Sequence, residues 1–250
     1  MFRALLSDAK TWTYIVDALS TLVDEANFVA KPDGLSMRAM DPSHVAMVDF
    51  VLPSDTFDEY ECDQETLLGV NLDEMKKIMR RARSGDTLEM IYEEAEKRLK
   101  LRLRGKTVRT FSIHLLDITA EELPEPSVEF KAFAIITADA LQEAVKDAAV
   151  TSDHVKIIIQ SDKVTFRAVG DLGEVVVEMG KDSEALLDIQ ASEESAATYT
   201  LNYLADMIKV AKAADTVKLQ LSTDMPLRID FNLPGGGRVS YFLAPRIEGE

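Results

Sequence analysis

The chain has 250 residues, of which 46% are hydrophobic and 29% are charged. This length allows one large domain or two of ordinary size, each with its own core. No apolar run approaches the roughly 20 residues that a membrane helix needs. The N-terminus lacks the long apolar centre of a signal peptide, and the single cysteine, Cys62, excludes an intrachain disulfide. We therefore expect an intracellular protein from a reducing compartment, with no membrane association.

The excess of acid limits how the chain could bind nucleic acid. It carries 44 Asp and Glu against 28 Lys and Arg, a formal net charge of −16. Such a surface repels polyanions, so nucleic acid cannot wrap over all of it. If DNA is a partner, the basic residues must be gathered in one place.

The first predicted elements are a strand over residues 1–6 and a helix that Ser7 or Asp8 can cap. Apolar residues recur in this helix at helical spacing: Trp12, Ile15, Val16, Leu19, Leu22 and Val23. Strand-like segments follow at residues 28–30, 35–40 and 46–52. The turn Pro32-Asp33-Gly34 separates the first two of these segments.

Residues 71–83 predict a helix with two different faces. At 3.6 residues per turn its apolar side chains fall in an arc of about 120°. These side chains are Leu72, Met75, Ile78, Met79 and Ala82. The cations spread over most of the other side: Lys76, Lys77, Arg80, Arg81 and Arg83. One face therefore belongs to a core and the other is positively charged, although an ordinary solvated helix face is an open alternative.

A turn follows at residues 84–86, and residues 88–92 and 99–103 read as strands with one solvated face. The same order of elements then returns. Residues 35–40 (LSMRAM) match 164–169 (VTFRAV), an offset of 129. At the same offset the first helix matches 137–150, residues 72–83 match 201–212, and residues 86–88 match 215–217. Residues 99–103 match 227–231 at an offset of 128. One offset across helices and strands indicates a duplicated domain.

Residues 117–129 (DITAEELPEPSVE) predict an extended connector, because they hold five acids, no base and two prolines that cannot join a sheet. We therefore divide the chain into domains at 1–116 and 130–250, with the connector between them. Each copy reads as strand, helix, strands, helix, strands. This pattern predicts the α+β class, with two helices on one face of a mostly antiparallel sheet in each domain.

The helix predicted at 201–212 repeats the polarity of its counterpart. Leu201, Leu204, Met207, Ile208 and Ala211 occupy its apolar arc. Lys209 and Lys212 stand where Arg80 and Arg83 stood. Cations at equivalent positions of two repeated helices favour a shared basic surface.

Three stretches resemble sliding clamps of the proliferating-cell-nuclear-antigen type: SMRAMDPSHVAMVDF (36–50), CDQETLLGVNLDEMKKIM (62–79) and YFLAPRIE (241–248). The duplication, the acidic connector and the length agree, so the resemblance covers essentially the whole chain. The acidic composition looks more archaeal than eukaryotic. The resemblance implies a DNA-clamp (processivity) fold in a ring of three subunits, identical or related, with every helix facing a central hole that duplex DNA threads.

A clamp that slides cannot read base edges, and it needs only diffuse attraction to phosphates. The DNA-facing channel is then expected to contain Lys10, Lys76, Lys77, Arg80, Arg81, Arg83, Lys146, Lys209 and Lys212. One departure is visible. The first helix, where family members offer several lysines, presents Lys10 beside Asp17 and Asp24, and Lys146 lies beside Glu143 and Asp147. The positive lining therefore rests mainly on the second and fourth helices.

The resemblance also implies a surface pocket for the short apolar and aromatic tails of partners. Its residues are Met40, His44, Val45, Leu123, Pro226, Phe242, Ala244, Pro245 and Ile247. Ordinary core packing is the open alternative for the residues around Met40. The implied partners are DNA polymerase, a clamp loader of the replication factor C type, flap endonuclease and DNA ligase. Burial of a few anchors beside main-chain pairing is the expected mode.

Ring closure is expected to pair an edge strand at 107–113 with one at 174–179 of the next subunit, because unpaired edges otherwise invite uncontrolled association. The interface residues on these edges are Lys106, Arg109, Phe111, Glu174, Val175, Val177 and Glu178. In this arrangement the two cations face the two glutamates across the interface.

The sequence offers no catalytic motif. His44, His114 and His154 are isolated from one another and from Cys62, so no metal site is expected. Residues 235–237 (GGG) lack the Lys-Ser/Thr of a phosphate loop and read as a turn between strands. We expect a clamp without catalysis or cofactor, in the cytoplasm or nucleoid, or in the nucleus of a eukaryote. A checkpoint-type clamp subunit and a nucleic-acid enzyme on a duplicated α+β scaffold are the alternatives.

Overall fold

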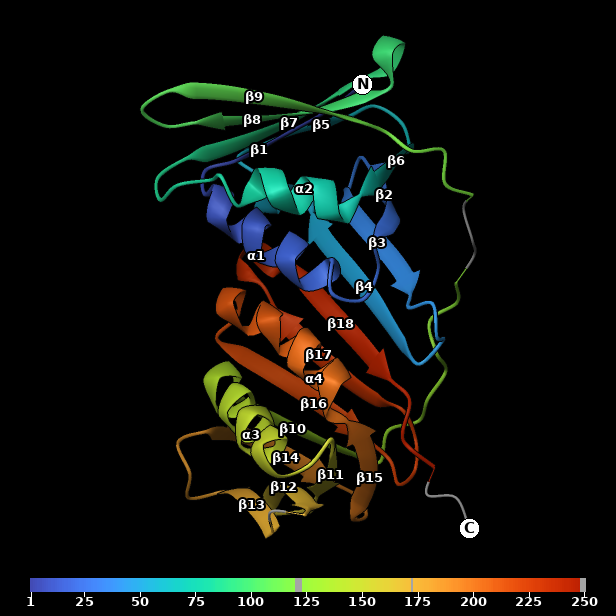
Figure 1. Cartoon of the computed structure of the whole chain (residues 1–250), viewed down its shortest axis with the longest axis vertical. Coiled ribbons are helices and arrows are strands. Elements are labelled where there is room, and N and C mark those ends of the chain that lie inside the picture. Colours follow the sequence, from blue (N-terminus) through green and yellow to red (C-terminus); the bar gives the residue numbers. More distant parts are fainter. Residues whose placement is uncertain (120–122, 172, 248–250) are drawn as a thin grey trace. The chain divides into compact units, whose positions relative to one another are not determined.

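The computed structural model describes residues 1–119, 123–171 and 173–247 (Figure 1). The chain forms two compact units. The first unit contains Met1–Pro42, Val48–Leu123 and Leu233–Val239, and the second contains Ser43–Met47, Pro124–Asn232 and Ser240–Glu250. In the described residues no helix is long and apolar enough to cross a membrane.

The first unit contains two antiparallel groups of strands and two α-helices. Its elements are β1 (Phe2–Leu6), α1 (Ala9–Leu19), β2 (Glu25–Lys31), β3 (Gly34–Met40), β4 (Ala46–Pro53), η1 (Ser54–Thr56), β5 (Glu59–Cys62), β6 (Thr66–Asn71), α2 (Leu72–Met79), β7 (Thr87–Glu93), η2 (Glu94–Glu96), β8 (Arg98–Arg104) and β9 (Val108–His114). The strand orders are β5-β1-β7-β8-β9 and β4-β3-β2-β6. Helices α1 and α2 lie side by side against these strands (Figure 1).

Aromatic packing fixes α1 against the sheet. The Trp12 ring lies 5.6 Å from the Phe28 ring of β2 and 6.0 Å from the Phe50 ring of β4, measured between centroids. All three side chains are almost fully buried. Of the two predicted caps, Ser7 and Asp8, it is Asp8 that caps the helix, because its side chain accepts a hydrogen bond of 2.9 Å from the Lys10 amide. The predicted apolar stripe up to Leu19 is therefore the core face of α1, whereas Leu22 and Val23 are buried after the helix has ended.

Helix α2 ends earlier than the sequence predicted. Asn71 caps its start by accepting a hydrogen bond from the Glu74 amide at 2.9 Å, but the α-helix stops at Met79 rather than at residue 83. Arg81 donates to the Ile78 carbonyl, a tighter turn of the 3₁₀ type. The Arg83 amide then bonds to the Asp86 side chain at 2.8 Å. This side chain offers the backbone an alternative to the helical bond, which explains the early end.

The second unit repeats the plan. Its elements are β10 (Ala132–Thr137), α3 (Ala138–Thr151), β11 (His154–Ile159), β12 (Lys163–Gly170), β13 (Gly173–Gly180), β14 (Leu186–Ala191), β15 (Ser195–Thr200), α4 (Leu201–Met207), η3 (Ile208–Ala213), β16 (Thr216–Leu221), β17 (Leu227–Asn232), η4 (Pro234–Gly236) and β18 (Arg238–Leu243). Two of these elements depart from this division: η4 lies wholly in the first unit, and β18 begins in the first unit and continues in the second from Ser240. The strand orders are β14-β10-β16-β17-β18 and β13-β12-β11-β15.

The duplication is confirmed by the starts of the elements and by the strand orders. α1 begins at Ala9 and α3 at Ala138, while α2 begins at Leu72 and α4 at Leu201, so both pairs differ by 129 residues. The order β5-β1-β7-β8-β9 corresponds strand for strand to β14-β10-β16-β17-β18, and β4-β3-β2-β6 corresponds to β13-β12-β11-β15. The predicted α+β class with antiparallel strands is also confirmed. The helix predicted at 201–212 is wrong in its second half, which is the 3₁₀ helix η3.

The described part of the predicted connector is anchored by polar contacts at each end and contains no helix or strand. In the first unit the Leu116 amide bonds to the Gly69 carbonyl at 2.8 Å, and Asn27 donates to the Ile118 carbonyl at 3.1 Å. Gly69 is required here, because a Cβ atom at this position would lie 2.1 Å from the Leu116 carbonyl oxygen. In the second unit Ser222 donates to the Glu129 carbonyl at 2.9 Å. Residues 120–122 lie outside the described part, and the boundaries 1–116 and 130–250 stay a prediction.

A buried carboxylate organises the five-stranded group of the first unit. Glu89 of β7 is 2% exposed, and its oxygens lie 2.8 Å from Arg3, 3.1 Å from Arg102 and 2.6 Å from Arg104. Burial alone would raise the pKa of Glu89, but hydrogen bonds from Arg3 and Arg104 outweigh it and lower the pKa below its usual value. The ionised carboxylate of β7 therefore ties together its two neighbouring strands, β1 and β8.

Replacing Glu89 by Gln should lower the free energy of unfolding at pH 7 by about 2 kcal/mol, because three cations lose a buried partner. Since the folded-state pKa is lowered, this contribution is present above the ordinary carboxyl pKa of about 4.3 and is lost as the pH falls through the folded-state value. Urea titrations of the parent and E89Q should therefore differ at pH 7 and converge in strong acid. The exposed Glu96→Gln serves as the control. Equal unfolding midpoints for parent and E89Q at pH 7 would contradict the assignment.

Candidate nucleic-acid interface

Helix α2 presents the cations that the sequence predicted. Lys77, Arg80, Arg81 and Arg83 are exposed, while Leu72 is buried in the core. Lys76 and Lys10 are partly covered, and Ile78 is half-buried rather than buried. Because α2 ends at Met79, the three arginines follow the helix in a turn instead of lying on it. The amphipathic division of this stretch into a core face and a cationic face is nevertheless present.

An acid on α1 partly neutralises this surface. The Asp17 carboxylate lies 3.8 Å from the Arg80 Nε and 4.0 Å from the Lys76 Nζ. Lys76 also donates a hydrogen bond of 2.9 Å to the Ser20 hydroxyl. The sequence showed that this face of α1 is near neutral, but it did not show that Asp17 reaches these two cations. In the described residues, the side chains of Lys77, Arg81 and Arg83 have no ion pair.

The second unit presents fewer cations on its helices. Lys146 of α3 is exposed, as are Lys209 and Lys212, which lie on η3 rather than on an α-helix. Lys209 forms an ion pair of 2.5 Å with Asp206. Gln142 of α3 donates to the Ile208 carbonyl at 3.2 Å and so ties η3 to α3. That these residues and those of the first unit line one channel stays a prediction.

The residues of the predicted partner pocket belong partly to the first unit and partly to the second. In the first unit Met40 and Leu123 are half-buried. In the second unit the Ala244 amide bonds to the Val45 carbonyl at 2.9 Å, which holds the chain end against the loop that contains His44. His44 is exposed and has a φ of 57°. The remaining members differ in exposure: Pro226 and Pro245 are half-buried, Phe242 is 4% exposed and Ile247 is 87% exposed.

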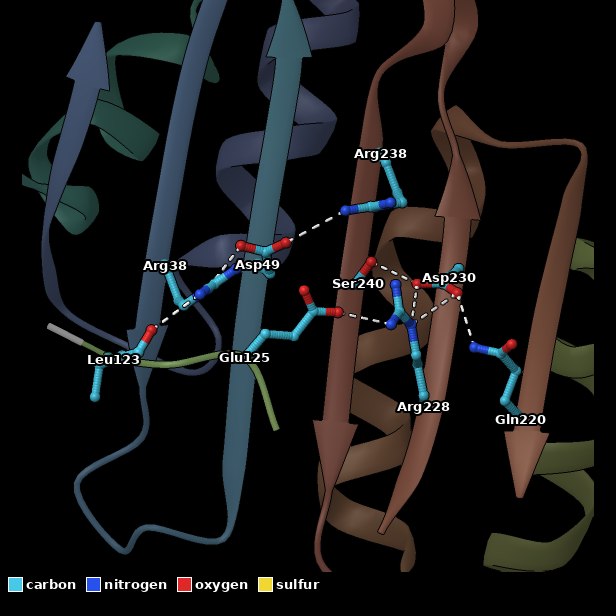
Figure 2. A network of polar contacts seen from close by, with 9 residues as sticks. All are labelled: Arg38, Asp49, Leu123, Glu125, Gln220, Arg228, Asp230, Arg238 and Ser240. Carbon is cyan, nitrogen blue, oxygen red and sulfur yellow. Dashed lines mark hydrogen bonds and ion pairs between the residues drawn. The ribbon is translucent and has the colours of Figure 1, made fainter. Parts of the chain in front are cut away.

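Two charge networks, one in each unit, hold the two described ends of the connector (Figure 2). In the first unit Arg38 binds the buried Asp49 at 2.9 Å and donates to the Leu123 carbonyl at 2.9 Å. In the second unit Arg228 binds Asp230 at 3.0 Å and Glu125 at 2.7 Å. Backbone that carries no regular structure of its own is thereby fixed by charge-assisted bonds.

Arg228 also covers an aromatic side chain of the predicted pocket. Its guanidinium carbon lies 5.2 Å from the centroid of the Phe242 ring, a cation–π contact. Asp230, which orients this guanidinium, also accepts a hydrogen bond from Ser240. The sequence identified Phe242 but gave no sign of Arg228, because the two residues belong to different strands.

The predicted interface strands are β9 and β13, and each lies at the edge of its group of described strands. The charged residues on them are already paired within the chain. Arg109 binds Asp86, Glu174 binds Arg167 and Glu178 binds Lys163. Exposed valines that the sequence analysis missed accompany them, since Val108 of β9 is 64% exposed and Val176 of β13 is 49% exposed. Phe111, Val175 and Val177 are half-buried, and Lys106 is exposed.

The other candidate motifs take structural places. Among the described residues no group of three or more His, Cys, Asp and Glu side chains could hold a metal ion. Gly235 lies in η4, between β17 and β18, and accepts a hydrogen bond of 2.6 Å from Thr56. Its φ of 72° requires a glycine-like conformation. Cys62 is a buried free thiol.

Comparison with known proteins gives matches over nearly the whole chain. Residues 1–122 match the family model of the proliferating cell nuclear antigen N-terminal domain, and residues 124–246 match that of its C-terminal domain. The DNA polymerase sliding clamp 1 of Pyrobaculum aerophilum is 40% identical over 242 residues, which cover 96% of each chain. The DNA polymerase sliding clamp of Pyrococcus abyssi is 38% identical and covers 99% of each chain.

Solved structures agree with this result. The crystal structure of PCNA from Thermococcus kodakaraensis has a TM-score of 0.94 at 31% identity, covering 98% of this chain and 100% of that one. A chain of the PCNA2–PCNA3 complex from Sulfolobus tokodaii has a TM-score of 0.92 at 26% identity, covering 98% and 99%.

Replacing Asp17 by Asn should strengthen retention of the protein on immobilised heparin, a polyanion, because Lys76 and Arg80 lose their neutralising partner. The salt concentration needed for elution should rise. Asp55→Asn changes the net charge equally at an exposed site on η1, outside α1 and α2, and it should have a smaller effect. Equal shifts for the two variants would show that overall charge, and not the α1–α2 face, controls retention.

Proposed function

The chain belongs to the proliferating cell nuclear antigen family, and from this premise we propose that it closes into a ring around duplex DNA through the residues described below. As a member of this family it is a DNA polymerase sliding clamp, a processivity factor without catalysis of its own. The observation that supports this function is the match of both halves of the chain to the family.

The helix cations suit a protein that holds DNA without stopping on it. Contacts from Lys and Arg to phosphates carry no sequence information and leave the complex free to slide. Lys77, Arg81 and Arg83 are exposed and have no ion pair in the described residues, so they are available for such contacts. The acidic remainder, which brings the chain to −16, disfavours DNA elsewhere on the surface. We propose that Lys10 and Lys146 contribute less than the α2 region.

The internal repeat supports a specific mode of ring closure. Within the first unit, the start of β18 lies beside β4, and Arg238 binds Asp49 at 3.5 Å. In the repeat, β18 corresponds to β9 and β4 corresponds to β13. We therefore propose that β9 of one subunit pairs with β13 of the next as β18 pairs with β4. The exposed Val108 and Val176 would become buried, and three subunits would close the ring.

The ring can contain identical chains or related ones. The Sulfolobus tokodaii complex named above contains two different PCNA chains. Lys106, Phe111, Val175 and Val177 are the interface residues that we assign in either case. We do not assign cross-subunit ion pairs to Arg109, Glu174 and Glu178, because these side chains have partners within the chain.

We further propose that short tails of partner proteins bind beside Val45, Leu123 and Ile247. The exposed Ile247 and the half-buried Val45 supply apolar surface, and Arg38 fixes the backbone at Leu123. Anchors of this kind give most of the affinity in peptide recognition. The partners proposed are DNA polymerase, the clamp loader, flap endonuclease and DNA ligase. The protein would act in the compartment that holds the DNA.

Retention on circular DNA tests the clamp function. A clamp loaded onto closed circular DNA should stay bound and should leave when the circle is cut, whereas a groove-binding protein is indifferent to the cut. Replacing Arg80, Arg83, Lys209 and Lys212 by Ala should weaken retention. It should reduce the salt slope of DNA association by up to about 4, since each phosphate contact contributes close to one.

Two measurements keep this test specific. The assembly mass, measured by light scattering, should be the same for the parent and the quadruple variant. A matched variant with Ala at Lys31, Lys97, Lys131 and Lys181, all exposed and off the helices, should keep most of the parent's retention. An unchanged salt slope in the helix variant would remove these cations from the DNA contact.

Replacing Val45 and Leu123 by Ala should weaken binding of a polymerase tail peptide by about 1–2 kcal/mol, roughly a 5- to 30-fold rise in Kd. Calorimetry with the synthetic tail measures this loss. The control replaces the exposed Leu67 and Leu187 by Ala and should leave the affinity unchanged. Normal tail affinity in the Val45 and Leu123 variant would place the pocket elsewhere.

A further inference from the structure

A basic surface cavity in the second unit is not used by any of these functions. Its volume is about 300 Å³. The lining residues come from the end of α3, from strands β11, β12 and β15, and from the segment after β18: Ser152, His154, Lys156, Arg167, Val169, Thr198 and Arg246. All of them belong to the second unit.

Strand register holds three of these residues side by side. Lys156 of β11 lies directly opposite Arg167 of β12 and directly opposite Thr198 of β15. Residues directly opposite each other in an antiparallel pair point to the same face of the sheet. The neighbouring residues Val155, Ile157 and Phe166 are fully buried and therefore point to the other face. The cavity thus lies on the face of these strands that is turned away from the core.

The segment after β18 completes the cavity. The Arg246 amide donates to the Thr198 carbonyl at 2.7 Å, which fixes the backbone beside β15. The Arg246 Nη1 lies 3.0 Å from the Nδ1 of His154, so the guanidinium is turned toward β11. A second guanidinium nitrogen of Arg246 stays available. The cavity is therefore bounded by residues whose backbones belong to three strands, to the end of α3 and to the segment after β18.

The charge of this cluster is unusual for the chain. Lys156, Arg167 and Arg246 bring three cations together, and Glu174, which binds Arg167, is the carboxylate paired with them. Lys156 has no ion pair in the described part of the chain. Like charges placed opposite each other on neighbouring strands destabilise a sheet. The chain has a net charge of −16, yet it places Lys156 and Arg167 opposite each other at a cavity. An anion bound in the cavity would offset the repulsion between these two cations.

We propose that this cavity binds a phosphate group, either as free phosphate or as the monoester of a small molecule such as a nucleotide. The number of donors selects phosphate over a carboxylate. Lysine supplies three N–H groups, each guanidinium supplies several in a planar fork, and Ser152 and Thr198 add hydroxyls. A carboxylate has two oxygens to receive these donors, whereas a phosphate has more and carries up to two charges.

The proposed phosphate site is separate from helix α3 and from the strand edge assigned to ring closure, whereas Arg246 stands between Pro245 and Ile247 of the predicted partner pocket. Helix α3, which carries Lys146, packs against β12 and β13 from the core side of the sheet. The cavity lies on the opposite face of these strands. β15 and Arg246 bound the cavity at the far edge of the group from β13, the strand that we assign to ring closure. A small anion in the cavity therefore leaves helix α3 and the ring-closure edge uncovered.

Isothermal titration of the full chain with inorganic phosphate, with a nucleoside monophosphate and with acetate, at constant ionic strength, tests the proposal. The expected result is saturable binding of one phosphate per chain and at least tenfold weaker binding of acetate. Comparable affinity for free phosphate and nucleotide identifies the phosphate alone as the ligand. Tighter binding of the nucleotide identifies the monoester. Absence of saturable binding by both, or equal affinity for acetate, would overturn the proposal.

Variants locate the binding. Replacing Lys156 and Arg167 by Gln should weaken phosphate binding at least tenfold, and the exposure of both side chains makes these changes compatible with folding. The matched control replaces Lys97 and Lys181 by Gln; both are exposed, neither lines the cavity, and this variant should bind phosphate like the parent. Thermal melting without phosphate confirms that both variants are folded. Equal phosphate affinity of the Lys156 and Arg167 variant and the parent would show that the ion binds elsewhere.

Discussion

The separation of positive from negative charge is the constraint on which this molecule depends. A chain of −16 that must surround a polyanion has to collect its cations on one kind of element and keep acid elsewhere. The helices allow this, because α2 buries Leu72, Met75 and Met79 and leaves Lys77 in solvent. Asp17 then limits the positive charge beside Lys76 and Arg80. Moderate and diffuse attraction suits a complex that has to move along its ligand.

The duplication of the domain also bears on how subunits assemble. The two copies have the same strand order, and each places its helices against a pair of antiparallel groups of strands. In this repeat β18 pairs with β4, whereas their counterparts β9 and β13 each have one unpaired edge in the described part of the chain. Unpaired edges with exposed valines such as Val108 and Val176 are a liability unless another copy covers them. The physical argument for a closed ring is therefore that closure removes these edges.

Periodicity and helix-capping rules were enough to predict the fold class, the repeat, a cap at Ser7 or Asp8 and most of the core face of each helix. It could not predict where α2 and the fourth helix end, because local hydrogen bonds such as that from Arg83 to Asp86 decide those positions. It also missed β5, which is short and strongly charged, and β6. In β6 the glycine at position 69 is required by the close approach of Leu116, a residue far away in the sequence. The pairs Asp17–Arg80 and His154–Arg246 join residues remote in sequence, so only the fold reveals them.

The two anion-attracting regions differ in how their cations are held, and this difference separates their roles. Lys77, Arg81 and Arg83 are exposed side chains without fixed partners in the described residues, so phosphates can pass them without one preferred position. Strand register places the backbones of Lys156 and Arg167 side by side, Arg167 binds Glu174, and Arg246 is held by its bonds to Thr198 and His154. A preorganised set of donors binds one oxyanion in one place, because little side-chain freedom is lost on binding. Positive side chains therefore have two different roles: those of the helix region attract DNA phosphates without fixing them, and those of the cavity on the sheet bind one phosphate group.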